Sequence, residues 1–184
     1  TVGERASSVV VVAAGAGADY TDAIALAGQL TAAEGFTPEG GAKNVARRDG
    51  IGTTFLSAAE TIGRIPDHYF QAVGSGTGAI AAWEANLRLA AAGYPGPASK
   101  RTRLHLAQNA PFRLLVDAWT AGDRALPSLD EGAAKAAIDA IDAKVLANRR
   151  PPWSPVGGLY DALVDTDGAM YAVENGAAAD AGAR

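Results

Sequence analysis

The chain has 184 residues, no cysteine, 16 basic and 20 acidic side chains, and a formal charge of −4 at pH 7. This length allows a sizeable hydrophobic core, and the mildly acidic balance argues against a broad surface for nucleic acid or anionic membranes. Without cysteine there is no disulfide framework, thiolate nucleophile or cysteine-ligated metal. The lack of cysteine fits a cytoplasmic protein. Only two histidines are present, so we expect no metal site.

The two ends of the sequence indicate whether it is a whole protein or a piece of one. The apolar run over residues 9–14 is shorter than the roughly 20 residues of a membrane span, and no basic signal-peptide region precedes it. The chain starts at Thr1 rather than at a methionine, and it stops at Arg184 inside a helix predicted to begin near Asn175. We therefore expect a piece of a longer protein. A processed chain with loosely ordered ends is the alternative.

The first third of the chain predicts a strand, a helix and a loop. Residues 8–13 are β-branched and continuous, which is typical of a strand covered on both faces. Asp19 or Thr21 is expected to cap a helix that runs to about residue 34. Residues 37–50 are rich in glycine and carry three cations within six residues, which favours a loop.

Strands and helices continue to alternate along the rest of the chain. Helices are expected over residues 53–62, 79–91, 112–120, 130–147 and 159–164, and strands over residues 68–73, 103–107 and 169–173. This order implies right-handed crossovers. The predicted fold class is therefore α/β, with three layers and a mostly parallel sheet between flanking helices.

A glycine-rich segment, Gly74-Ser75-Gly76-Thr77-Gly78, lies between a predicted strand and a predicted helix. Backbone N–H groups and a helix N-terminus converge on an anion at such a position, and glycines let a phosphate approach closely. The alternative is a tight turn whose glycines only let the helix pack on the strand. The residues that follow match neither a P-loop nor a dinucleotide site, which favours the monophosphate of a cofactor or substrate.

A second candidate site combines Lys43, Asn44, Arg47 and Arg48. A guanidinium group matches phosphate, carboxylate or sulfonate through two hydrogen bonds, and an asparagine amide adds another donor. The alternative interpretation is solvated surface charge, with Arg48 paired to Asp49.

Four further polar residues lie in or next to predicted strands. His68 and His105 are interpreted as hydrogen-bonded structural side chains rather than as catalysts. Gln108 and Asn109 follow the carboxyl end of a strand, where open α/β sheets place ligands. They are candidates to line a pocket, and a helix cap formed by Asn109 is compatible with that role.

Three blocks of sequence carry a resemblance to a known family. They are HYFQAVGSGTG at residues 68–78, LHLAQNAPF at 104–112 and GGLYDAL at 157–163. In this order they resemble the cysteate synthases, which are relatives of threonine synthase among the fold-type II pyridoxal-phosphate enzymes. The similarity runs from about residue 9 to residue 182. It implies a tryptophan synthase β-like fold that is incomplete here.

The resemblance also implies roles for the two candidate sites. The loop from Gly74 to Gly78 would hold the phosphate of pyridoxal phosphate. The pattern Asn44-x-x-Arg47-x-Asp49-Gly is similar to the Asn-x-x-Arg-x-Glu-Gly stretch with which threonine synthases hold their substrate's phosphate. Asn44, Arg47 and Arg48 are therefore expected to bind O-phosphoserine.

The implied activity is a β-replacement in which sulfite displaces phosphate from O-phosphoserine and gives cysteate. Threonine synthase, or another β-replacing or lyase relative, is the alternative within the family. A non-catalytic phosphate-binding α/β module is the alternative outside it. The implied partners are small molecules, with neither nucleic acid nor a membrane, and a homo-oligomer is compatible with them.

The resemblance finally implies an incomplete enzyme. The family anchors its cofactor through a lysine in a segment similar to Ser-Phe-Lys, and none of Lys43, Lys100, Lys135 and Lys144 stands in that context. We therefore expect no catalytic residue here and little activity from these residues alone. Residues 1–40 would be the end of a smaller domain, and residues 41–184 would be part of the larger, phosphate-binding domain.

Overall fold

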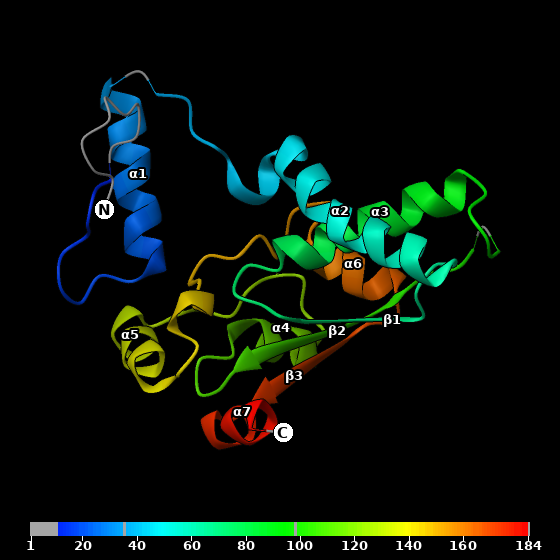
Figure 1. Cartoon of the computed structure of the whole chain (residues 1–184). Coiled ribbons are helices and arrows are strands. Elements are labelled where there is room, and N and C mark those ends of the chain that lie inside the picture. Colours follow the sequence, from blue (N-terminus) through cyan, green and yellow to red (C-terminus); the bar gives the residue numbers. More distant parts are fainter. Residues whose placement is uncertain (1–10, 35, 98, 184) are drawn as a thin grey trace. The chain divides into compact units, whose positions relative to one another are not determined.

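A computed structural model describes residues 11–34, 36–97 and 99–183 (Figure 1). The chain divides into an N-terminal unit, residues 1–38, and a C-terminal unit, residues 39–184, and each is described here by itself.

The described part of the N-terminal unit forms the helix α1 (Tyr20–Glu34). The Asp19 carboxylate accepts hydrogen bonds from the N–H groups of Thr21 and Asp22 at 2.9 and 3.1 Å, which confirms Asp19 as the predicted cap. The strand expected over residues 8–13 lies partly outside the described residues. Its described part, residues 11–13, is not a strand, because a strand needs a hydrogen-bonded neighbour and none is formed here.

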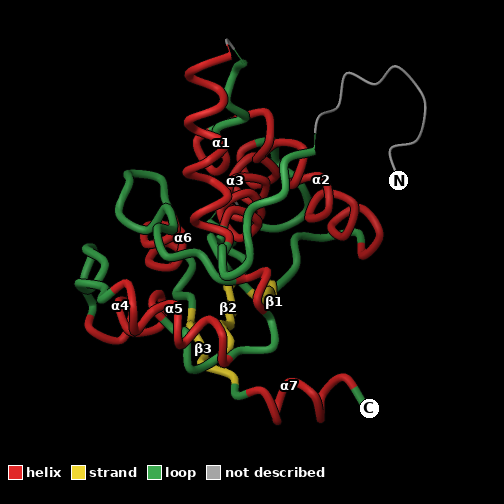
Figure 2. The backbone as a smooth tube through the Cα atoms, turned by 90° about the vertical axis from the view of Figure 1, so that its left-hand side faces the viewer, coloured by secondary structure: helices red, strands yellow, loops and turns green. Residues whose placement is uncertain are grey.

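The C-terminal unit is built around a parallel sheet of three strands in the order β1-β2-β3. In chain order its elements are α2 (Val45–Ile62), β1 (His68–Ala72), α3 (Thr77–Ala91), β2 (Arg103–Asn109), α4 (Leu114–Ala121), α5 (Glu131–Ala140), α6 (Leu159–Asp165), β3 (Ala169–Val173) and α7 (Asn175–Gly182). Short 3-10 helices span Gly41–Lys43 and Lys144–Leu146. The predicted α/β class with a parallel sheet and flanking helices is confirmed (Figure 2).

The core lies on one face of this sheet. Leu104 and Leu106 of β2 are completely buried, and they pack in one cluster with side chains of α3, α4 and α6. Trp153 and Leu159 complete that cluster, and both are fully buried. This packing fixes the junction between β1 and α3, where the glycine-rich segment lies.

The loop expected over residues 37–50 is wrong from Val45 onward, because α2 begins there, eight residues before the helix predicted to start at Thr53. Gly40 and Gly41, which precede α2, have positive φ angles and do lie in a turn, whereas Gly52 within the helix serves packing. A Cβ atom at Gly52 would lie 3.3 Å from the carbonyl oxygen of Ala81, so this glycine lets α2 approach α3 closely. Figure 1 shows the two helices side by side.

The helix expected over residues 130–147 is shorter than predicted and ends at Ala140. Ile141 is extended and buried, and the N–H groups of Asp142 and Ala143 donate to the side-chain oxygen of Asn109 at 3.1 and 3.0 Å. The N–H groups that would continue the helix therefore bond to the Asn109 side chain at the end of β2.

Candidate functional site

The glycine-rich segment forms the turn between β1 and α3. Gly76 is the residue before the first turn of α3 and has a φ of 76°, a left-handed conformation that glycine adopts readily. No side chain among the described residues caps this helix end. The hydroxyl groups of Ser75 and Thr77 lie 3.0 Å apart. The segment therefore offers backbone N–H groups and two hydroxyls at the positive end of a helix, which is a donor set that fits a phosphate.

The three glycines of this segment also pack closely against other parts of the protein. A Cβ atom at Gly74 would lie 2.8 Å from the backbone of Leu146, and one at Gly76 would lie 2.5 Å from the side chain of Leu159. At Gly78 it would lie 2.5 Å from the side chain of Gln71. A tight turn is therefore enough to explain the glycines, and they do not by themselves indicate an anion site. The support for an anion site comes from the uncapped start of α3.

The second candidate site lies at the start of α2. Asn44 caps this helix: its Oδ1 atom accepts from the N–H of Arg47 at 3.3 Å, and its Nδ2 atom donates to the carbonyl of Glu39 at 2.7 Å. The Arg47 guanidinium lies 2.6 Å from the Glu39 carboxylate, and both side chains are exposed. The N–H of Gly41, followed by Arg47, lowers the pKa of Glu39, so this carboxylate is charged at neutral pH.

Arg48 is held differently. Its Nε atom lies 2.9 Å from the carboxylate of Glu84, and its Nη1 atom donates to the carbonyl of Ala42 at 2.5 Å. The two charged side chains are only 16% and 21% exposed. The predicted alternative pair of Arg48 with Asp49 is wrong, because Asp49 pairs with Arg88 of α3 at 2.7 Å. Both arginine pairs therefore join α2 to α3.

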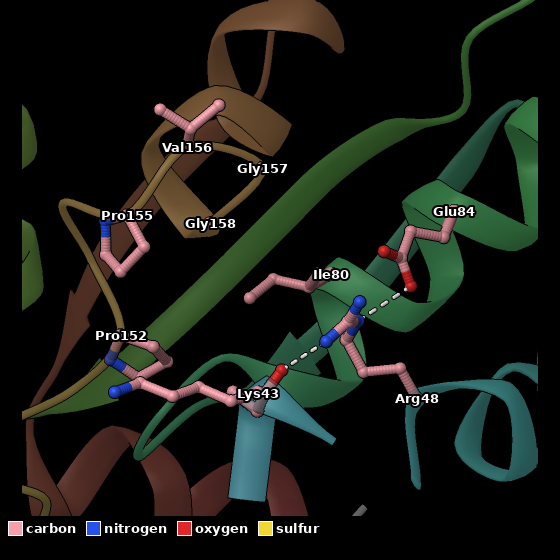
Figure 3. Close-up of a pocket in the computed structure, with 10 residues that line it drawn as sticks. Lys43, Arg48, Ile80, Glu84, Pro152, Pro155, Val156, Gly157 and Gly158 are labelled. Carbon is pink, nitrogen blue, oxygen red and sulfur yellow. Dashed lines mark hydrogen bonds and ion pairs between the residues drawn. The ribbon is translucent and has the colours of Figure 1, made fainter. Parts of the chain in front are cut away.

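A cavity of about 280 Å³ lies beside the start of α2 (Figure 3). It is lined by Lys43 and Arg48, by Ile80 and Glu84 of α3, and by the loop at residues 152–158. Figure 3 shows the Lys43 side chain extending toward Pro152. Neither Asn44, Arg47 nor residues 74–78 belong to the described lining. The structure thus brings Lys43 and Arg48 to the cavity and leaves the other predicted site residues outside it.

The loop at residues 152–158 and the acidic residues Glu39 and Glu84 were missed by the sequence analysis as parts of the site. Gly157 and Gly158 belong to one of the three family-like blocks, so the loop had a signal in the sequence. Glu84 had none, because it lies 36 residues from its partner Arg48, whereas Glu39 lies only eight residues from Arg47. The effect of the two glutamates is to neutralise two of the three cations at the start of α2.

The polar residues at the end of β2 have structural roles. The Oε1 atom of Gln108 accepts from the N–H groups of Leu115 and Val116 at 2.7 and 3.1 Å, so Gln108 caps α4. The prediction that Asn109 forms this cap is wrong. The two side chains point to opposite faces of the sheet, and only Gln108 faces α4. Neither residue lines the cavity described above.

His68 and His105 confirm the structural interpretation, because their ring nitrogens Nδ1 and Nε2 lie 3.0 Å apart in a hydrogen bond. Among the described residues, no helix combines the length and the apolar character that a membrane span requires. The same residues contain no group of three or more histidine, aspartate or glutamate side chains placed to hold a metal ion.

The cap at the start of α2 gives a first prediction. Asn44→Ala in the full-length protein should lower the free energy of unfolding by about 1 kcal/mol, because the N–H of Arg47 loses its acceptor. Urea denaturation measures this loss. Asp130→Ala is the matched control, since Asp130 caps α5 through the N–H of Ala133 at 2.7 Å and lies far from α2 in the sequence. An Asn44→Ala protein as stable as the parent would contradict the cap.

Comparison with known proteins identifies the family. Residues 5–184 match the profile of a family described as "Pyridoxal-phosphate dependent enzyme". The chain belongs to this family, whose members are enzymes that act on small molecules with pyridoxal phosphate as cofactor. The predicted resemblance is thereby confirmed, and the hypothesis of a non-catalytic module loses its support.

Proteins named cysteate synthase are among the relatives. The chain is 57% identical to that of Methanosarcina mazei over 171 residues, which is 92% of this chain and 41% of the relative. It is 55% identical to that of Methanosarcina acetivorans over 179 residues, 97% of this chain and 42% of the relative. The cysteate synthase of Methanoregula boonei is 60% identical over 158 residues, which is 85% of this chain and 37% of the relative. The chain thus spans about two fifths of the length of these relatives.

Proposed function

We propose that the chain is part of a pyridoxal-phosphate enzyme that makes cysteate, with O-phosphoserine and sulfite as substrates. The observation that carries this proposal is the identity of 57% and 55% to two cysteate synthases over nearly the whole chain. We place the enzyme in the cytoplasm. Residues 1–40 are assigned to the end of its smaller domain and residues 41–184 to its larger domain, and a homo-oligomer is compatible with this proposal.

The turn between β1 and α3 is the proposed site for the cofactor phosphate. The uncapped N–H groups at the start of α3 and the hydroxyls of Ser75 and Thr77 support this assignment. Pyridoxal phosphate, when bound, supplies the electron sink that lets the bond from the substrate's Cβ to phosphate break and a bond to the sulfur of sulfite form. The contribution of residues Gly74 to Gly78 is to hold the phosphate and so to orient the cofactor.

This assignment predicts the effect of removing one hydroxyl. Thr77→Val in the full-length enzyme should weaken pyridoxal phosphate binding by about ten-fold, because a hydrogen bond to a charged group is lost while the side-chain shape is kept. Titration of cofactor absorbance measures the affinity. Thr102→Val is the control: this buried hydroxyl donates to the carbonyl of Pro66 and lies before β2, away from the turn. Equal affinities of the two variants would contradict the assignment.

The start of α2 is the proposed site for the substrate phosphate, with Asn44, Arg47 and Arg48 in different roles. The exposed pair of Arg47 with Glu39 is weak enough for a dianionic phosphate to replace the carboxylate. Arg48 stays with Glu84 and keeps α2 against α3, while Asn44 fixes the first turn of the helix. Lys43 adds a positive charge at the cavity, and no described side chain forms an ion pair with it.

The experiment that tests the function uses the full-length protein with pyridoxal phosphate, O-phosphoserine and sulfite. Mass spectrometry should detect cysteate, together with one phosphate released per molecule formed. The alternative within the family predicts instead that O-phosphohomoserine is converted to threonine without sulfite. If neither product forms while the cofactor is bound, the proposed reaction is wrong.

The proposal also predicts which lysines do not anchor the cofactor. A lysine that reacts with an aldehyde must be partly deprotonated through burial or a neighbouring cation. Lys100 forms an ion pair with Asp67, and Lys43, Lys135 and Lys144 are exposed, so none of the four is buried. Borohydride reduction of the full-length holoenzyme, followed by peptide mapping, should therefore place the label outside these 184 residues. A label at Lys43, the lysine at the cavity, would contradict this prediction.

A further inference from the structure

Two asparagines, Asn109 and Asn175, lie at the same edge of the sheet as the glycine-rich turn. Asn109 is the last residue of β2, and Asn175 begins α7 just after β3. Gly74 comes just after β1. Because the three strands are parallel, their carboxyl ends meet at one edge, which is where open α/β sheets bind ligands. Neither asparagine belongs to the turn or to the described lining of the cavity.

The two side chains bind each other and the chain that leaves α5. The Nδ2 atom of Asn109 donates to the Oδ1 atom of Asn175 at 2.8 Å. The Oδ1 atom of Asn109 accepts from the N–H groups of Asp142 and Ala143 at 3.1 and 3.0 Å. Asn175 also accepts from the N–H of Asp142 at 3.1 Å and donates to the carbonyl of Ala140 at 2.9 Å. The pair therefore holds the main chain just after α5 at the ends of β2 and β3.

The same stretch of main chain lies against the glycine-rich turn. The N–H of Leu146 donates to the carbonyl of Ala143 at 2.8 Å, next to the short 3-10 helix at Lys144–Leu146. A Cβ atom at Gly74 would lie 2.8 Å from the carbonyl carbon and oxygen of Leu146, so the main chains of these two residues are in contact. The hydrogen bond from Ala143 to Asn109 thus fixes one end of a single turn whose other end packs on Gly74.

The buried side chains on the two sides of this contact belong to different clusters. Ile141 and Ala147, on either side of the 3-10 turn, are buried in a cluster with Phe112. Val73 and Ala79, on either side of the glycine-rich turn, are buried in the cluster that covers β2. Apolar contacts are also non-directional, whereas hydrogen bonds have a preferred geometry. The hydrogen bonds of the two asparagines therefore supply the direction in which the one turn is set against the other.

We infer that Asn109 and Asn175 are positioning residues for the cofactor phosphate, which act through residues 142–146 and Gly74. The inference rests on the proposed phosphate site at the turn between β1 and α3. Main-chain N–H groups bind a phosphate only when they point at one position, so a displacement of Gly74 would turn some of them away. As positioning residues, the two asparagines need no contact with the phosphate.

Phosphorus NMR of the full-length holoenzyme tests this role, because the ³¹P resonance of bound pyridoxal phosphate reports on the surroundings of its phosphate. Asn175→Ala should shift that resonance and weaken cofactor affinity about five-fold. Asn175→Asp keeps an oxygen that accepts from Asp142 and Asn109, and a carboxylate suits the start of α7. It should therefore restore most of the parent resonance and affinity.

Thr102→Val is the matched control for a merely structural loss. Its buried hydroxyl donates to the carbonyl of Pro66 before β2, at the opposite edge of the sheet. This variant should lower the free energy of unfolding without moving the ³¹P resonance. If Thr102→Val shifts the resonance as much as Asn175→Ala does, the shift reflects general destabilisation and the inference is rejected.

A second measurement follows the contact itself in the full-length protein freed of its cofactor. Amide hydrogen exchange at residues 74–77 should be faster in Asn175→Ala than in the parent and should slow again in Asn175→Asp. Exchange that rises equally throughout the sheet would overturn the inference, because the asparagines would then stabilise the whole fold rather than the turn.

The comparison with Thr77→Val separates this inference from the phosphate site on which it rests. If Thr77→Val weakens cofactor binding while Asn175→Ala leaves both the resonance and the affinity unchanged, the site stands and the positioning role is rejected. If neither variant changes cofactor binding, the phosphate lies elsewhere and both assignments are rejected.

Discussion

Gly76→Ala in the full-length protein is expected to destabilise the turn between β1 and α3 for two separate reasons. The φ of 76° costs a residue with a Cβ atom about 1 to 2 kcal/mol. The new Cβ atom would also lie 2.5 Å from the end of the Leu159 side chain, which is completely buried, and such overpacking costs about 1 to 3 kcal/mol. Urea denaturation should show both losses, and cofactor affinity should fall with them.

Gly63→Ala is the matched control for this substitution. Gly63 ends α2 with a φ of 71°, and no atom of the described residues lies within 4 Å of the Cβ atom that alanine would add. It therefore carries the backbone cost without the overlap, so its loss of stability should be smaller. Combining Gly76→Ala with Leu159→Ala should give less than the sum of the two single losses, because the overlap is relieved. Equal losses at Gly63 and Gly76, or strict additivity in the double variant, would mean that Leu159 does not press on the turn.

The order of strands and helices could be predicted because hydrophobic periodicity is a local property. The three strands of the sheet and the helix α3 could be predicted from the spacing of apolar residues that are neighbours in the sequence. The start of α2 could not be predicted in the same way. Gly52 looks like a loop residue until the carbonyl of Ala81, which comes from another helix, is seen to lie against it. Sequence alone does not separate a glycine required by a turn from one required by close packing.

The candidate site likewise combines features that neighbouring residues predict with features that depend on distant contacts. Arg47 and Arg48 were identified because residue type and spacing carry the chemistry of anion binding. Which of them is free to bind depends on Glu39 and Glu84, and the second of these comes from α3. The cavity adds a loop from more than a hundred residues further along the chain. Contacts between distant segments are set by the fold as a whole, and no local pattern encodes them.

Arg47→Ala in the full-length enzyme is expected to raise the KM for O-phosphoserine about ten-fold or more, because a charged hydrogen bond to phosphate is worth about 1.5–3 kcal/mol. Cofactor affinity should change little, since Arg47 lies on α2 and the glycine-rich turn precedes α3. Steady-state kinetics with sulfite at saturation measures the first effect, and cofactor titration measures the second.

The neighbouring variants separate a substrate contact from a structural one. Glu39→Gln removes the charge that competes for Arg47, so it should lower the KM for O-phosphoserine while Arg47→Ala raises it. Arg48→Ala breaks the link between α2 and α3, so it should reduce thermal stability more than Arg47→Ala does, because its ion pair is the more buried of the two. If Arg47→Ala and Glu39→Gln both leave the KM unchanged, the start of α2 carries only surface charge. The substrate phosphate must then bind beside Lys43 or outside these 184 residues.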